Sequence, residues 1–223
     1  MTPVQQYART LAAFSEDQWL AYVMQREPLS GRLSPERQKE LYHGALDCGR
    51  EQAVILRRGH DDASIADLVA ATGVEVYLDD IQSDGVFTTF ATYSEKQGIR
   101  IYVDNARATD ELIQREGLTD LSGGVKTEDL LLSHELFHVV EGNTPDLFTE
   151  QKHVELFRLG PLVRRSKVLC LCEVAAMAFA KELTGLPCNP YVFDIVMLYA
   201  KNPQRARQQY EQIVRICGKT EEQ

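Results

Sequence analysis

The sequence predicts an α+β fold that is mostly helical, with a small and partly antiparallel sheet beside one buried helix. Two kinds of observation lead to this fold class. Long stretches without proline or glycine begin and end with the capping signals typical of helices. Near the middle of the chain, short runs rich in threonine, aromatic and branched side chains are separated by turn residues, as in strands. At 223 residues, the chain can bury a sizeable core.

The N-terminal part is predicted to be helical. Residues 5–26 carry apolar side chains at helical spacing, and a proline and a glycine follow them. A serine followed by proline then starts a second helix over residues 34–58. We therefore expect an N-terminal helical segment over residues 1–60 and a larger domain over residues 61–223, packed together as one compact unit.

The sheet is predicted from three segments that follow a short helix at residues 64–72. They are Val74–Asp79, Val86–Tyr93 and Ile99–Asp104. The third segment alternates apolar and polar side chains, and the loop at residues 94–98 has the length and glycine of a hairpin connection.

The next helix is predicted over residues 127–141. Thr127 is the expected N-cap, and acidic residues in the first turn suit the helix dipole. Gly142 and Asn143 are expected to end the helix in a left-handed conformation. Because its side chains are apolar nearly all round, this helix should be buried on most sides.

Three further helices are predicted in the C-terminal part of the chain. One covers residues 167–184 and ends at a glycine. Asn-Pro pairs then start the other two, over residues 190–201 and 203–217. The segment between residues 143 and 165 is assigned no regular element.

Composition and charge narrow the possible partners. The net charge of −9 argues against nonspecific nucleic-acid binding by the whole surface. The longest apolar run, residues 168–180, is too short to span a membrane, and the N-terminus has no signal-peptide pattern. We therefore expect a cytoplasmic protein without a membrane partner, whose five cysteines are reduced.

The most informative motif is H-E-x-x-H, formed by His134, Glu135 and His138. On a helix, residues four apart lie on one face, so the two imidazoles can bind one metal ion, with Glu135 beside them as a general base. The alternative is a chance match to a short pattern. The buried helix weakens that alternative, because ionisable groups in apolar surroundings are costly unless they are paired or bind a metal.

Glu173 is the candidate third ligand, because it is the one polar residue of the run 168–180. A carboxylate in such surroundings should be buried and needs a cation, yet the run contains no lysine or arginine. A salt bridge with a distant arginine, or a protonated carboxyl group, is the alternative. Catalytic zinc usually takes three protein ligands and keeps one position open, which these residues would satisfy.

Two other groups of residues are weaker candidates. His153 lies in a mixed polar stretch and is expected in a loop or a short helix; alternatively, it lines the cleft and stabilises an oxyanion. Cys170 and Cys172 could bind a soft metal. On a helix, however, residues two apart point to different faces, so we interpret both as small core residues.

The H-E-x-x-H motif, together with the pattern E-x-x-A-x-x-F-A that starts at Glu173, resembles the ImmA/IrrE family of bacterial metallopeptidases. The similarity covers residues 62–187. It implies a zincin-like fold of the gluzincin type, in which His134, His138 and Glu173 bind Zn²⁺ and the glutamate of the motif is the catalytic base.

The resemblance also implies a protein or peptide substrate. In the family this is often a helix-turn-helix repressor, and the substrate chain would align on a sheet edge, for which Ile99–Asp104 is the candidate. Phe137 stands where the family usually has glycine, and Ala175 and Met177 stand where it has acidic or amide residues. These departures support an alternative function, a zincin-like metal-binding regulatory or interaction protein with little or no protease activity.

Overall fold

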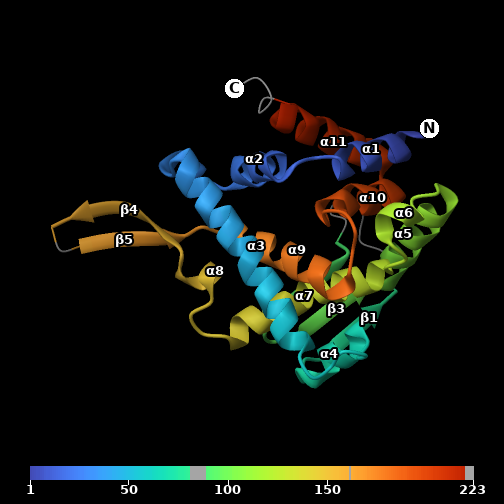
Figure 1. Ribbon diagram of the computed structural model, residues 1–223, viewed down its shortest axis with the longest axis horizontal. Helices are drawn as coiled ribbons and strands as arrows, with labels where there is room; N and C mark the ends of the chain where they lie inside the picture. Colours follow the sequence, from blue (N-terminus) through green and yellow to red (C-terminus); the bar gives the residue numbers. More distant parts are fainter. Residues whose placement is uncertain (81–88, 161, 219–223) are drawn as a thin grey trace.

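Figure 1 shows the computed structural model, which describes residues 1–80, 89–160 and 162–218. It is mostly helical with two small sheets, in agreement with the predicted class. The helices are α1 (Pro3–Ala12), α2 (Glu16–Arg26), the 3-10 helix η1 (Ser30–Arg32), α3 (Pro35–Arg57), α4 (Ile65–Ala71), α5 (Val103–Arg115), α6 (Thr119–Ser122), α7 (Thr127–Asn143), α8 (Phe148–Gln151), α9 (Cys170–Thr184), α10 (Tyr191–Lys201) and α11 (Pro203–Gly218). The strands are β1 (Val76–Asp79), β2 (Ala91–Ser94), β3 (Gly98–Tyr102), β4 (His153–Leu159) and β5 (Leu162–Lys167).

The three-stranded sheet has the order β1-β3-β2 and lies beside α7. Its central strand, β3, runs parallel to β1 and antiparallel to β2. Ile99 and Ile101 of β3 are fully buried in the core, which explains why this strand alternates apolar and polar side chains. The predicted small and partly antiparallel sheet beside the H-E-x-x-H helix is therefore confirmed.

The predicted strands differ from the observed ones at their ends. Of the expected strand Val86–Tyr93, residues 86–88 lie outside the described residues, and β2 begins only at Ala91. The predicted strand Ile99–Asp104 is wrong at its end, because the chain turns into α5 at Val103. Helix α5 was not predicted, because the alternation of apolar residues in β3 continues as far as Val103, the first residue of α5.

The predicted single helix over residues 5–26 is wrong, because the chain forms two helices there. Ser15 breaks the run by capping α2: its hydroxyl accepts a hydrogen bond from the Gln18 amide (3.3 Å), and the Gln18 side chain accepts one from the Ser15 amide (2.8 Å). This reciprocal capping box satisfies two amides that a continuous helix would have paired internally. The local capping signal therefore outweighs the apolar periodicity.

The H-E-x-x-H helix, α7, is slightly longer than predicted. The expected left-handed end is wrong, because Gly142 has no positive φ and α7 continues through Asn143. The expected N-cap is also wrong: Thr127 is already the first helical residue. Its amide and hydroxyl donate to the Asp110 carboxylate (2.9 and 2.5 Å), so this side chain of α5 holds the start of α7.

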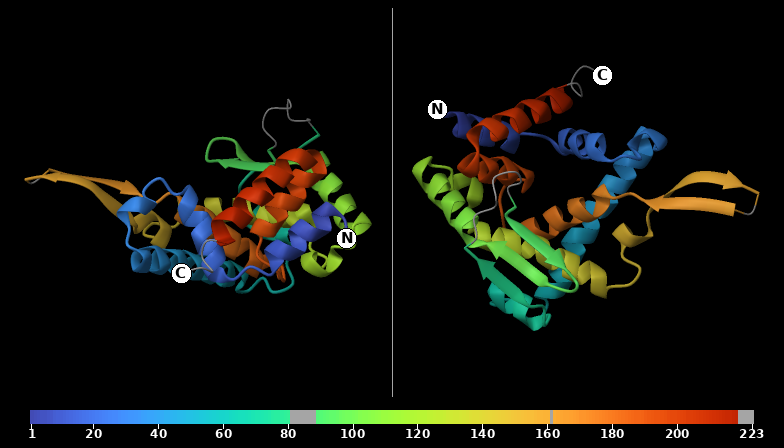
Figure 2. Two further views of the ribbon diagram at one scale, coloured as in Figure 1. Left: turned by 90° about the horizontal axis from the view of Figure 1, so that it is seen from above. Right: turned by 180° about the vertical axis from the view of Figure 1, so that it is seen from behind.

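The segment between α7 and α9, for which no regular element was predicted, contains α8 and an antiparallel hairpin. The hairpin consists of β4 and β5 and projects from the helical body in both views of Figure 2. The helices predicted over residues 167–184, 190–201 and 203–217 correspond to α9, α10 and α11. Within the described part of the chain, no helix combines the length and the apolar character needed to cross a membrane.

The core is centred on α9, which packs along both α3 and α7. A Cβ atom added at Gly49 of α3 would lie 2.1 Å from the carbonyl oxygen of Ala175 in α9, so the glycine is what allows this close approach. Between α9 and α7, the rings of Phe137 and Phe179 lie 5.6 Å apart and are fully buried. These contacts set the distance between the two helices that carry the candidate ligands.

We predict that Gly49→Ala lowers the free energy of unfolding by about 1–3 kcal/mol, because the methyl group would force α3 away from α9. Urea unfolding measures this change. Gly142→Ala is the matched control, since Gly142 is also helical and nothing lies within 4 Å of its added Cβ. That variant should be stabilised slightly, by roughly 0.5–1 kcal/mol. Equal effects of the two substitutions would contradict the close-packing argument.

Candidate metal centre

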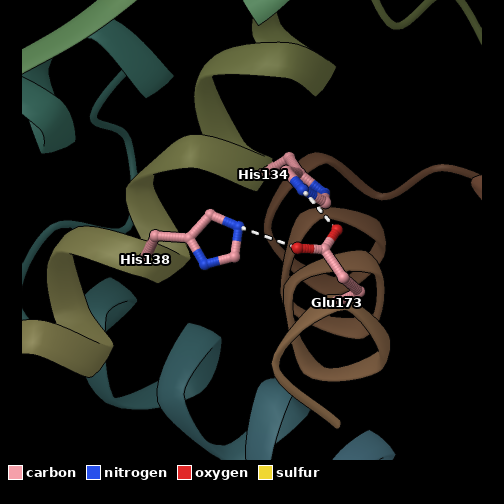
Figure 3. Close-up of side chains that lie close together, drawn as sticks. All are labelled: His134, His138 and Glu173. Carbon is pink, nitrogen blue, oxygen red and sulfur yellow. Dashed lines mark ion pairs between the residues drawn. The ribbon is translucent and has the colours of Figure 1, made fainter. Parts of the chain in front are cut away.

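The two histidines of the motif lie on one face of α7. Their ring centroids are 5.2 Å apart, as expected for residues one helical turn apart. Figure 3 shows both imidazoles pointing toward Glu173, which projects from α9. The packing of α7 against α9 therefore brings Glu173 next to the two histidines, from which it is distant in the sequence.

The spacing of these three side chains suits a metal ion. Nε2 of His134 lies 3.4 Å from Oε2 of Glu173, and Nε2 of His138 lies 3.7 Å from Oε1. Two ligand atoms bound at about 2.0–2.1 Å to a tetrahedral ion are about 3.3 Å apart. One ligand atom from each of the three residues lies within 4.8 Å of the others. The group could therefore hold a metal ion, as the sequence predicted for these residues.

Glu173 is more exposed than predicted. Its side chain retains 53% of its accessible surface, whereas the apolar run around it led us to expect burial. The reason is its place in the first turn of α9, at the edge of a cavity, where Leu169 is exposed as well. The alternative of a salt bridge with a distant arginine is not observed, because the ion-pair partners of this carboxylate among the described residues are the two histidines.

A cavity of about 640 Å³ opens beside the ligand group. Residues from α2, α7, α9 and α10 line it, together with the chain that leads into β2. Glu135 lies in its wall and is only 8% exposed. Among the described residues that line the cavity, Arg26 of α2 is the only lysine or arginine. The cavity could therefore admit a substrate chain next to the ligand group and the candidate base.

Burial and charge shift the pKa values of these groups in different directions. Burial raises the pKa of Glu135, despite the nearby histidines. Burial would lower the pKa of His134, but the hydrogen bond and charge of Glu173 outweigh it and raise that pKa. The same hydrogen bond, from His134, holds the pKa of Glu173 well below its usual range. The carboxylate of Glu173 is therefore ionised over the ordinary pH range.

Asp194 of α10 is an acidic cavity residue that the sequence analysis missed. It lines the same cavity as the ligand group, and burial raises its pKa to about 6, although the charges of His134 and Arg26 oppose this shift. The signal that could have revealed it was the one used for Glu173, a single carboxylate within an apolar helical run.

Glu141 lies near His138, on the side of the imidazole ring that faces away from Glu173. Oε2 of Glu141 lies 4.0 Å from Nδ1 of His138, the ring nitrogen that faces away from Glu173. The buried Thr149 hydroxyl donates a hydrogen bond to the same carboxylate group. Carboxylates in this position orient a metal-binding histidine and fix its tautomer. The sequence analysis missed Glu141, although it follows His138 by the three residues that place two side chains on one helix face.

Glu27 anchors the start of the helix that carries the third ligand. Its carboxylate accepts hydrogen bonds from the amides of Cys170 (2.9 Å) and Leu29 (3.0 Å), and the residue is buried. An anion at the first turn of a helix satisfies free amides and suits the helix dipole. The end of α2 and the start of α9 are therefore joined by one side chain.

The other sequence candidates lie outside the ligand group. His153 is not in a loop or a short helix but is the exposed first residue of β4. Its Nδ1 lies 3.0 Å from the Gln151 carbonyl oxygen, and it does not line the cavity. Cys170 and Cys172 are partly buried, and the group of possible ligands that the described residues form contains neither.

The two residues that depart from the family pattern lie in different surroundings. Phe137 is fully buried and points into the core against Phe179, so it does not line the cavity. Met177 does line the cavity, one turn along α9 from Glu173. Phe137 therefore leaves the ligand group unobstructed.

No family model, curated protein or solved structure matches this chain. The resemblance to the ImmA/IrrE family therefore depends on the residues of the two motifs. The geometry of the ligand group and the cavity is the evidence from which a function can be proposed.

We predict that Glu141→Gln lowers the affinity for Zn²⁺ by about 10–100-fold, because His138 loses the carboxylate that orients its ring. Competition with a chromophoric chelator measures the affinity. Glu150→Gln is the control, since Glu150 pairs with Lys167 and contacts none of the three ligands. Unchanged zinc affinity in Glu141→Gln would show that Glu141 does not support the site.

Proposed function

We propose that this protein is a zinc-dependent peptidase. The observation that carries the proposal is the convergence of His134, His138 and Glu173 beside a cavity whose wall contains the buried Glu135. Two imidazoles and one carboxylate are a common ligand set of catalytic zinc, and they leave a coordination position open. When bound, the metal would supply Lewis acidity that lowers the pKa of water and polarises the scissile carbonyl group.

Glu135 is suited to move the proton in such a reaction. It neighbours His134 in the sequence, lines the cavity, and has a pKa that burial raises above the usual carboxylate value. A base with a raised pKa accepts a proton more readily and can still pass it on. We assign Glu135 to accept the proton of the attacking water and to deliver it to the leaving amine.

The cavity and the sheet suggest how a polypeptide substrate would bind. Many of the lining residues are apolar, including Val23, Leu130 and Met197, and would contact substrate side chains. The expected substrate strand on Ile99–Asp104 is not available, because β3 is the central strand. Of the described strands, β2 pairs only with β3, and its first residue lines the cavity. A substrate chain added to the free edge of β2 would run toward the metal ligands.

The substrate class proposed is a specific intracellular protein, such as a regulator, as the family resemblance implies. The second candidate function is a metal-binding regulatory or interaction protein without efficient peptidase activity. Met177, which lines the cavity where the family has an amide or acidic residue, is the observation that favours it. The two candidates share the ligands and differ in the role of Glu135.

We predict that purified wild-type protein binds one equivalent of zinc and that His134→Ala and Glu173→Ala lose most of it, because two ligands hold zinc far less tightly than three. Elemental analysis after dialysis measures the content. His153→Ala is the matched control, since this exposed histidine lies outside the ligand group. Full occupancy in either ligand variant would refute the ligand assignment.

We predict that Glu135→Gln retains zinc but cleaves an unfolded test protein such as casein at least about 100-fold more slowly, because the amide cannot accept the proton. Gel electrophoresis and mass spectrometry of the fragments measure cleavage, and elemental analysis measures the zinc. Cleavage that persists in the variant with zinc bound would remove the base role. Zinc-loaded wild type that cleaves no test polypeptide would instead support the metal-binding alternative.

A further inference from the structure

The hairpin of β4 and β5, here called the arm, is built differently from the rest of the molecule. It projects from the body, with the end of β4 and the start of β5 farthest from the helices (Figures 1 and 2). Its base is held by Val154, which is buried in the core, and by Arg32, whose guanidinium donates to the Leu156 carbonyl oxygen (2.9 Å). Beyond that base, most side chains of the arm are exposed.

The outer end of the arm is apolar. Leu159 and Leu162 are directly paired next to the turn, and they are 73% and 59% exposed. Phe157 lies on the same face, two residues closer to the body, and is 47% exposed. Exposed apolar side chains that gather at one projecting point are unusual on a protein surface unless they bind something.

The next positions of the arm toward the body carry positive charge. Arg158 lies opposite Val163, Arg164 opposite Phe157, and Arg165 opposite Glu155. Glu155 accepts two hydrogen bonds from Arg158 (2.9 and 2.6 Å). Arg164 and Arg165 form no ion pair with the other described residues. A collar of arginines therefore surrounds the apolar tip, in a chain whose net charge is −9.

We propose that the arm docks this protein on an anionic lipid surface. Leu159 and Leu162 enter the boundary between headgroups and acyl chains, where apolar side chains are stabilised by leaving water. Arg158, Arg164 and Arg165 then lie at the level of the lipid phosphates. Insertion is shallow, because both edges of a two-stranded hairpin carry unpaired amide and carbonyl groups that cannot enter the hydrocarbon region.

The shape of the arm favours a lipid surface over a protein partner. A stable protein interface needs about 800 Å² from each side, with complementary shapes. The tip is a narrow, convex end of two strands, whereas a lipid surface adapts to any shape. Two arms of neighbouring copies would also bring their unpaired arginines together, which disfavours packing of arm against arm.

The length of the arm reduces the electrostatic repulsion between the negatively charged body of the protein and an anionic lipid surface. The seven residues of β4 span about 20 Å at a rise of about 3.3 Å per residue. The Debye length at physiological ionic strength is about 8 Å. Because Val154 anchors the inner end of β4 and the tip inserts into the lipid, the negatively charged body stays about one Debye length from the headgroups, where their repulsion is weakened.

This proposal differs from the expectation drawn from the sequence, which was that the protein has no membrane partner. That expectation concerned spanning segments and signal peptides. The alternation of leucine and arginine in the arm becomes informative only once the pairing of β4 with β5 shows which residues lie together at the tip.

The test is sedimentation of the purified protein of residues 1–223 with vesicles of phosphatidylglycerol and phosphatidylcholine. We expect binding that is at least about tenfold weaker on vesicles of phosphatidylcholine alone and that falls as salt is raised from about 0.1 M to about 1 M. The double variants Leu159→Ser/Leu162→Ser and Arg164→Gln/Arg165→Gln should each lower the partition coefficient about tenfold or more.

Leu78→Ser is the matched control, because Leu78 is also exposed but belongs to β1, outside the arm. It should bind vesicles as wild type does. The proposal would be overturned if wild type failed to bind the anionic vesicles. It would also be overturned if the arm variants bound them as strongly as wild type does. Light scattering measures the molecular mass in solution and distinguishes one further outcome. If wild type does not bind vesicles and the arm variants have a lower mass than wild type, a second copy of the protein covers the arm instead of lipid.

Discussion

The close packing of α9 against both α3 and α7 is the constraint on which the candidate site depends. Gly49 lets α3 approach the Ala175 carbonyl group, and Phe137 of α7 packs on Phe179, one turn further along α9. With α9 held from two sides, Glu173 has little freedom to move relative to the two histidines. A wider separation of α7 and α9 would move the Glu173 carboxylate away from the two imidazoles, which now lie 3.4 and 3.7 Å from it.

The ligand group combines burial with charge in a way that prepares it for a cation. The acidic residues Glu27, Glu135, Glu173 and Asp194 line one cavity with His134, and Arg26 is the one lysine or arginine among the described residues of its wall. In such surroundings an excess of carboxylates is costly unless a positive ion joins them. A metal ion would therefore relieve electrostatic repulsion as well as provide chemistry, and Glu141 would hold His138 ready to receive it.

The sequence predicted the parts of the molecule that depend on local signals. Caps, proline positions and helical spacing located α3 and α9, and the absence of helix breakers located α7, although both of its predicted caps were wrong. The H-E-x-x-H motif and the apolar run around Glu173 located the three candidate ligands. One error had a local cause, since the cap at Ser15 that divides residues 5–26 into two helices was missed. The other errors arose where distant segments decide the structure. The strand alternation of β3 ran into α5, the mutual pairing of β4 and β5 left no clear local signal, and Glu173 was expected to be buried although the apolar run around it ends at a cavity.

The hydrogen bond between Glu27 and the Cys170 amide has a consequence for the modularity of this chain. Glu27, at the end of α2, caps α9, the helix that carries the candidate third ligand. Gly49 of α3 allows α9 to pack closely against α3. The N-terminal helices could not be deleted, or exchanged for an unrelated accessory domain, without disturbing the ligand geometry. Changes in this N-terminal region during evolution would therefore be restricted by the geometry of a candidate metal site to which it contributes none of the three candidate ligands.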